Sequence, residues 1–167
     1  MSDKDTDIPK HGRRDRLVQE QVHDPYMARA KLPEPTLCPE CGAMFAEGRW
    51  EWHTGSTAGA HEHLCPACQR IRDDVPAGFL TLSGDFLQQH REEILQLVHN
   101  KVKGETARRP MNRLMAIEDD EDGNVVITFT DTHLPAGVGR AIESAYEGEF
   151  DIRYTEEAGI VRAYWKR

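Results

Sequence analysis

Cys38-Pro39-Glu40-Cys41 and Cys65-Pro66-Ala67-Cys68 share one short pattern, and together they contain all four cysteines of the chain. Two residues between thiolates allow one tight turn to direct both sulfurs at a single tetrahedral centre. Gly42 follows the first pair, at a position suited to a turn that passes through positive φ. Two such turns complete a Cys₄ set, typical of a structural zinc ribbon or treble clef. The sequence therefore predicts that Zn²⁺ is bound by Cys38, Cys41, Cys65 and Cys68.

The interval between the two pairs, residues 42–64, is slightly longer than in common zinc sites, so we expect a hairpin with an extended loop. His53, His61 and His63 lie in this interval. Four cysteines already satisfy zinc, so these histidines are expected at the surface. A closed Cys₄ set also leaves no open coordination position for catalysis. Since no nucleophile or nucleotide-binding motif is found either, we expect no enzyme. A zinc hydrolase that uses these histidines is the least favoured alternative.

Composition places the chain among soluble proteins with a modest core. It has 167 residues, 38% of them hydrophobic, and a mean hydropathy of -0.67. No apolar run approaches the length of a membrane span, and the charged N-terminus lacks the apolar core of a signal peptide. We therefore expect a cytoplasmic protein without membrane contact, in which thiols stay reduced and bind metal rather than form disulfides.

Charge is distributed unevenly along the chain. The net charge is -8, but residues 117–157 alone carry 12 acidic and 2 basic side chains. The remaining residues have a net charge of +2, so one part of the molecule can present a basic surface while the other is acidic.

Patterning divides the chain into four segments. Residues 1–36 are charged and predict a flexible basic arm; residues 37–82 are the Cys₄ module. Residues 83–110 predict a connecting amphipathic helix, with Ser83 or Asp85 as N-cap. Residues 111–167 predict a small α+β domain. The fold class is therefore α+β: a zinc ribbon or treble clef joined by a helix to a second domain.

The second domain is expected to have the order β-β-α-β-β. Strands at residues 114–118 and 125–130 flank an Asp-Gly hairpin signal. A helix then starts at Asp131 or Thr132 and stops at Gly148, before strands at residues 150–154 and 160–165. We expect an antiparallel sheet with the helix on one face.

Basic residues supply the candidate RNA contacts. Five cations near the end of the predicted helix exceed what its dipole requires: Lys101, Lys103, Arg108, Arg109 and Arg113. The N-terminal arm adds Arg13, Arg14 and Arg16, and Arg49 with Trp50 can stack on exposed bases. The structural alternatives are a solvated arm, cations that complement the helix dipole, and a tryptophan in the core.

Three stretches of the chain carry a family resemblance. They are the second cysteine pair with the leucine-rich run at residues 93–98, the strand at residues 122–133, and the strands near residues 148–152 and 162–165. In these stretches the chain resembles the Nmd-type adaptors, which bind the large ribosomal subunit. The resemblance covers roughly residues 37–167. The chain is also similar to a group of short uncharacterised bacterial zinc-ribbon proteins, through the lead at residues 31–36 and Gly48-Arg49-Trp50.

The resemblance implies a cytosolic factor that contacts ribosomal RNA or a ribosomal protein. Because the cysteine set is closed and no phosphate-binding glycine loop is found, we expect a non-catalytic zinc-binding adaptor with no nucleotide as ligand. The alternative is a protein–protein interaction module whose acidic C-terminal domain meets a basic partner.

Overall fold

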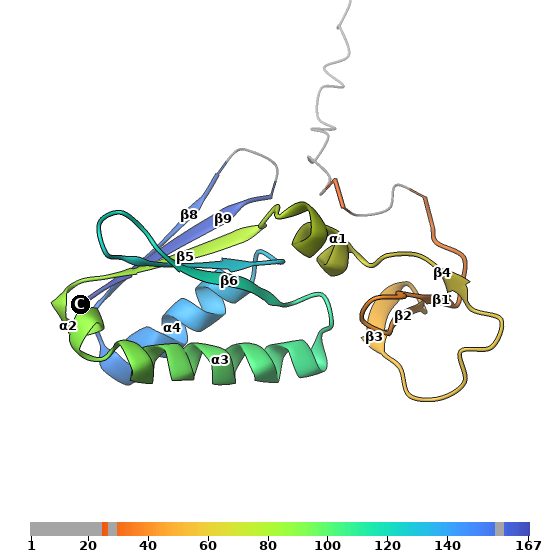
Figure 1. Cartoon of the computed structure of the whole chain (residues 1–167), viewed down its shortest axis with the longest axis horizontal. Coiled ribbons are helices and arrows are strands. Elements are labelled where there is room, and N and C mark those ends of the chain that lie inside the picture. The colour runs from red at the N-terminus through yellow and green to blue at the C-terminus, as the bar shows by residue number, and fades with distance from the viewer. Residues whose placement is uncertain (1–24, 27–29, 156–158) are drawn as a thin grey trace, which may run out of the picture.

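The computed structural model describes residues 25–26, 30–155 and 159–167. It contains two parts that lie end to end, joined by α1 (Figure 1). We call residues 36–73 the cysteine module and residues 78–167 the sheet domain. The module contains β1 (Thr36–Leu37), β2 (Ala43–Ala46), β3 (Arg49–Trp52), β4 (His61–Glu62) and α1 (Pro66–Asp73). The sheet domain contains β5 (Gly78–Ser83), α2 (Asp85–Gln89), α3 (Arg91–Arg108), β6 (Leu114–Asp119), β7 (Val125–Phe129), α4 (Leu134–Tyr146), β8 (Glu149–Tyr154) and β9 (Val161–Lys166).

The cysteine module is a small sheet followed by a helix. Its strands have the order β3-β2-β1-β4, and β2 and β3 form the hairpin expected between the cysteine pairs. Glu47 and Gly48 turn that hairpin with positive φ at both positions, as a two-residue hairpin loop requires. The second cysteine pair opens α1 rather than a further hairpin. This order of knuckle, hairpin and helix is a treble clef, which settles the choice left open by the sequence.

The sheet domain contains a five-stranded sheet in the order β6-β7-β5-β9-β8. Its central strand, β5, pairs antiparallel with β7 and parallel with β9. The sheet is therefore mixed, which corrects the prediction of an antiparallel sheet. The predicted order β-β-α-β-β is present in β6, β7, α4, β8 and β9.

The position of β5 differs from the predicted segment boundaries. Residues 76–82 were assigned to the Cys₄ module, whereas Leu80 and Leu82 lie fully buried at the centre of the sheet. The physical reason is the pairing of β5 with strands that follow much later in the chain. The boundary between the two parts therefore lies before β5.

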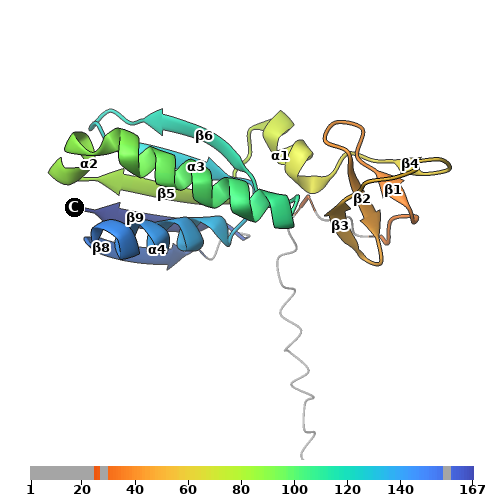
Figure 2. The same cartoon turned by 90° about the horizontal axis from the view of Figure 1, so that it is seen from below.

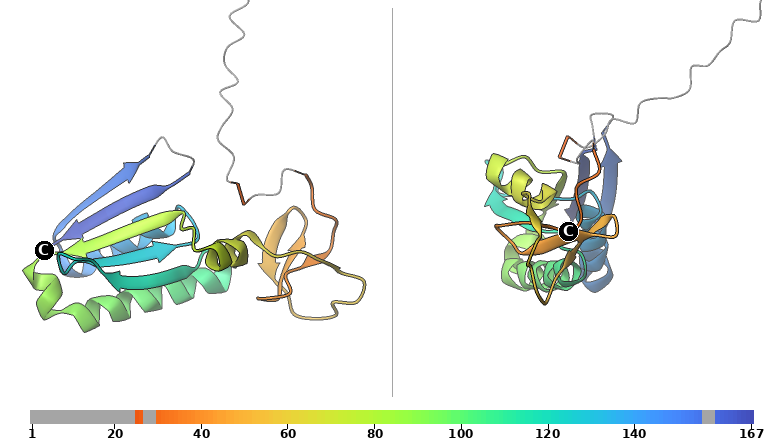
Figure 3. Two further views of the ribbon diagram at one scale, coloured as in Figure 1. Left: turned by 45° about the horizontal axis from the view of Figure 1, so that its top comes forward. Right: turned by 90° about the vertical axis from the view of Figure 1, so that its right-hand side faces the viewer.

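Helices α3 and α4 cover the same face of the sheet (Figure 2). Ile94, Val98 and Val102 of α3 are buried at the predicted helical spacing. Helix α3 thus belongs to the sheet domain and does more than connect two domains. The core contains 14 buried side chains: Leu80, Leu82, Leu87, Ile94, Val98, Val102, Val125, Ile127, Phe129, Leu134, Val138, Ile142, Ala163 and Trp165. None of the described helices or strands lies over the opposite face (Figure 3).

The predicted helix at residues 83–110 is present with two changes. It starts at Asp85, with Gly84 rather than Ser83 as the N-cap residue. It is also interrupted at His90, which separates α2 from α3. Gly84 has φ of 101°, and a Cβ there would lie 2.2 Å from the Arg167 carbonyl oxygen. Arg167, which follows the last strand, therefore approaches too closely for a side chain at position 84, and this explains the glycine before the helix.

Candidate metal centre

The two cysteine pairs converge on one point of the module. Cys38 and Cys41 lie on the turn between β1 and β2, and Cys65 and Cys68 lie at the start of α1. The four sulfurs lie within 4.8 Å of one another, and the Cys41 and Cys65 sulfurs are 3.7 Å apart. All four cysteines are free thiols. The sequence prediction that these residues form one site is consistent with this geometry.

The spacing of the sulfurs fits a tetrahedral metal. Zn–S bonds of about 2.3 Å place the sulfurs of a tetrahedron about 3.8 Å apart. The sulfurs can therefore hold one metal ion with little movement. No histidine of the described region belongs to this group; His61 and His63 are exposed and His53 contacts the Ser56 carbonyl oxygen at 3.2 Å. The expected surface positions of the histidines agree with this arrangement.

Backbone geometry explains why each pair points inward. Gly42 closes the first turn with φ of 79°, and its N–H donates to the Cys38 carbonyl oxygen at 3.0 Å. In the second pair, Cys65 is the N-cap of α1 and its sulfur accepts from the Cys68 N–H at 3.4 Å. Pro66 occupies the first helical turn, where its missing N–H costs nothing. The Cys65 N–H in turn donates to the Cys38 sulfur at 3.3 Å, which ties the two pairs together.

A cation from the sheet domain completes the surroundings of the sulfurs. Arg113 lies just before β6, and its guanidinium donates to the Cys68 sulfur at 3.3 Å and the Cys65 sulfur at 3.5 Å. Its Nε donates to the Pro110 carbonyl oxygen at 2.6 Å, which fixes the side chain. A Zn²⁺ ion on four thiolates leaves the centre negative, so a positive charge beside it is favourable.

Thiol ionisation at the site depends on its surroundings. Burial raises the pKa of the Cys65 and Cys68 thiols, and hydrogen bonding from Arg113 acts in the opposite direction on Cys68. Burial also acts on Cys38, but backbone hydrogen bonds from Cys65, Cys41 and Glu40 outweigh it and lower its pKa to about 7. Buried thiolates are costly without a nearby cation, so a metal ion would replace their protons.

Arg113 was predicted to contact RNA phosphates, and the structure gives it a different role. Burial opposes its charge, yet interaction with the Cys41 and Cys68 sulfurs raises the pKa of the guanidinium. Because its donors are directed at sulfur, the side chain is not presented to a phosphate. The sequence offered no signal for this contact, since 45 residues separate Arg113 from Cys68.

The other predicted RNA-binding residues have different surroundings. Arg13, Arg14 and Arg16 lie outside the described residues. Arg49 is exposed and pairs with Glu51 at 2.6 Å. Trp50 is half-buried against the cysteine cluster, with its ring centroid 5.6 Å from that of Phe45.

On α3, two predicted cations share one carboxylate. Lys101 and Arg108 pair with Glu105 at 3.6 and 2.5 Å. Lys103 and Arg109 are exposed and make no ion pair with any residue that the structure describes. The end of α3 thus retains two uncompensated positive charges.

Trp52 joins the module to the end of α3, a role that the sequence did not indicate. Its indole N–H donates to the Thr106 carbonyl oxygen at 2.7 Å, and the Arg113 guanidinium carbon lies 5.6 Å from the centre of its ring. Around this contact lies a shallow hollow of about 500 Å³, lined in part by Trp52, Lys103 and Thr106. Strand β3 and the basic end of α3 are therefore neighbours.

Comparisons with known proteins leave the family resemblance as a hypothesis. No family model, no curated protein and no solved structure matches this chain. Within the described part of the chain, no helix is both long enough and apolar enough to cross a membrane.

Proposed function

We propose that this protein is a zinc-stabilised, non-catalytic adaptor that binds structured RNA, of the kind that ribosomal subunits expose. Four thiolates are the set that structural zinc prefers, and they leave no open position for a reacting water. In this proposal the metal folds the module, and binding takes place on the surface beside it.

The observation that carries the proposal is the contact between β3 and α3. The hydrogen bond from Trp52 to Thr106 joins β3, which carries the exposed Arg49, to the end of α3, where Lys103, Arg108 and the following Arg109 are exposed. We call these four residues, contributed by two separate segments, the junction patch. Neighbouring cations on a fixed frame are suited to successive phosphates of an RNA backbone.

The acidic charge of the chain lies partly at the opposite end of α3. Asp119, the last residue of β6 and next to the acidic turn, pairs with Arg91 at the start of α3 at 2.7 Å. Helix α3 has 18 residues, so its two ends are about 27 Å apart. The screening length at physiological salt is about 8 Å, so the acidic turn has little effect on a phosphate at the junction patch.

The test is RNA binding by a variant that removes three cations of the junction patch. In a filter-binding titration with ribosomal RNA, Lys103→Ala/Arg108→Ala/Arg109→Ala should weaken binding strongly at low salt. It should also flatten the dependence of log K on log salt, by roughly 0.7 to 0.9 per lost phosphate contact.

The matched control removes the same charge elsewhere. Arg140, Arg153 and Lys166 are exposed cations on α4, β8 and β9, so their triple alanine variant changes the net charge equally. It should bind nearly as wild type does. Equal losses in both variants would show only a dependence on net charge. No RNA binding by the zinc-loaded wild type, together with no co-sedimentation with ribosomal subunits, would refute the proposal.

A further inference from the structure

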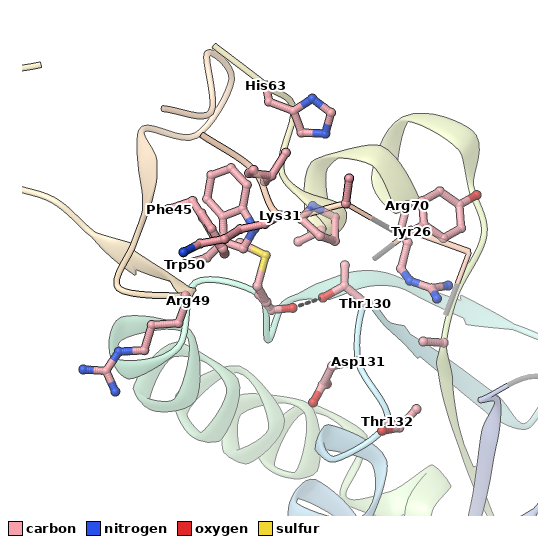
Figure 4. Close-up of a pocket in the computed structure, with 17 residues that line it drawn as sticks. Tyr26, Lys31, Phe45, Arg49, Trp50, His63, Arg70, Thr130, Asp131 and Thr132 are labelled. Carbon is pink, nitrogen blue, oxygen red and sulfur yellow. Dashed lines mark hydrogen bonds between the residues drawn. The ribbon is translucent and has the colours of Figure 1, made fainter. Parts of the chain in front are cut away.

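A cavity of about 490 Å³ lies between the cysteine module and the sheet domain (Figure 4). One wall includes Phe45 and Trp50 of the module's strands and Lys31, which precedes the module. The other walls include Arg70 on α1 and Thr130 of the sheet domain. The volume is in the range of small-ligand sites in proteins.

The rings of Tyr26, Phe45 and Trp50 line part of the cavity. Trp50 and Phe45 meet at an interplanar angle of 58°, so their rings form a corner rather than a closed stack. On the α1 side, the Tyr26 ring lies beneath the Arg70 guanidinium, 4.5 Å from its central carbon. One face of the Tyr26 ring is thus covered, so an aromatic ligand has its stacking partner on the Trp50 side of the cavity.

The charge of the lining is positive. Lys31, Arg49 and Arg70 contribute cations, of which Arg49 is paired with Glu51. Lys31 is exposed and makes no ion pair with a residue of the described ranges.

Asp131 is the acidic residue in the lining of this cavity. Its carboxylate accepts from the backbone N–H groups of His133 and Leu134 at 3.0 and 3.3 Å, where α4 begins. Because these N–H groups already bind the Asp131 carboxylate, it repels an anion near Lys31 only weakly.

We propose that this cavity receives one unstacked nucleotide of a single-stranded RNA segment, with its base against Trp50 and its phosphate near Lys31. Aromatic rings beside cations are what single-stranded RNA sites use, because every base has a flat face and a linked phosphate. The choice of RNA, rather than a free nucleotide, as the ligand rests on the proposed function above.

Two features favour RNA over a free nucleotide. The lining has no glycine-rich phosphate loop of the type found in P-loop and dinucleotide-binding sites. Strand β3 also links the cavity to the junction patch, since Trp50 lines the cavity and Trp52 contacts α3. A strand of RNA on the patch could thus place one base in the cavity.

The experiment measures fluorescence anisotropy of a labelled oligoadenylate of about eight nucleotides, a length within the usual range of single-strand sites. Trp50→Leu keeps apolar bulk but removes the flat ring, and should weaken binding at least about fivefold. Trp50→Phe keeps an aromatic ring and should retain most of the wild-type affinity. Lys31→Ala should reduce the salt slope by about 0.7, the amount expected for one phosphate of a single strand.

Controls separate a folding defect from a lost contact. Zinc content and circular dichroism establish that each variant is folded. Because Trp50 packs near the cysteines, exposed Lys31 supplies the variant that is safest for folding.

The outcomes separate the two proposals. Wild-type affinity in Lys31→Ala and Trp50→Leu, with loss in the junction-patch variant, would refute the cavity proposal and leave the proposed function standing. No binding of the oligoadenylate by wild type would refute the cavity proposal alone, whereas no binding of ribosomal RNA and no co-sedimentation with ribosomal subunits would refute both. Adenosine monophosphate that competes as strongly as the oligonucleotide, mole for mole, would overturn RNA as the source and assign the cavity to a free nucleotide.

Discussion

The two parts of the molecule are stabilised by different means. The sheet domain buries a continuous apolar core between its sheet and two helices, with residues such as Phe129 and Trp165 fully buried. The cysteine module has no comparable core among its described residues: the cluster around its site consists of Cys38, Cys65, Ala67 and Cys68. In such a module a bound metal ion supplies the stabilisation that apolar burial supplies in the sheet domain. We therefore expect the cysteine module to unfold when the metal is removed, and the sheet domain to lose stability when its apolar core is disrupted.

The largest expected effect is metal removal. Chelation, or Cys38→Ser, should unfold the cysteine module, because binding of structural zinc contributes about 10–16 kcal/mol in small zinc domains. In ¹H–¹⁵N spectra the indole signals of Trp50 and Trp52 should move to unfolded positions, whereas that of Trp165 should stay. Added zinc should restore the chelated sample. A shift of the Trp165 signal as well would mean that the two parts unfold as one unit.

The second largest effect is expected from a mutation that opens a cavity in the core of the sheet domain. Phe129 is fully buried on β7, so Phe129→Ala should lower the free energy of unfolding of the sheet domain by about 3–5 kcal/mol. Urea titrations followed by circular dichroism measure this loss. Metal content should remain at the wild-type level in the absence of urea. If Phe129→Ala released the metal, the division between the two parts would be wrong.

The smallest effect concerns the contact between the parts. Arg113→Ala removes the donors to the Cys65 and Cys68 sulfurs, and residues that support metal ligands typically change metal affinity by about 10- to 100-fold. Competition with a chromophoric chelator measures this change.

The controls for Arg113 distinguish charge from geometry. Arg113→Lys keeps the charge but loses the paired N–H donors of the guanidinium, so its metal affinity should lie between those of wild type and Arg113→Ala. Arg109→Ala removes an exposed cation nearby and should leave metal affinity unchanged. Wild-type affinity in Arg113→Ala would show that the contact is incidental to the metal.

Local patterns were sufficient to predict most elements. Cysteine spacing identified the candidate ligands, since two residues between thiolates constrain a single turn. Alternation and turn residues located β6 to β9 and α4 near their observed bounds. The mixed sheet was not predictable in this way, because β5 pairs with β9 from a distant part of the chain. Gly78, for example, lies beside Val161.

The same limit applied to the site. The four cysteines carry their signal in their spacing, whereas Arg113 and Trp52 act through contacts with distant segments. Neither residue differs in type from the exposed arginines and tryptophans of other proteins. Only the packing of α3 against β3 reveals what they contact.

The separation of charge along α3 also bears on how fast a partner can arrive. An acidic turn lies at one end of this helix and uncompensated cations at the other, so charges of opposite sign are separated along α3. A dipole of this kind turns in the field of a polyanion before the surfaces touch, and oriented approach raises association rates. At low salt, where screening is weak, the charges at the two ends of α3 would therefore affect how fast a polyanion arrives more than how fast it leaves.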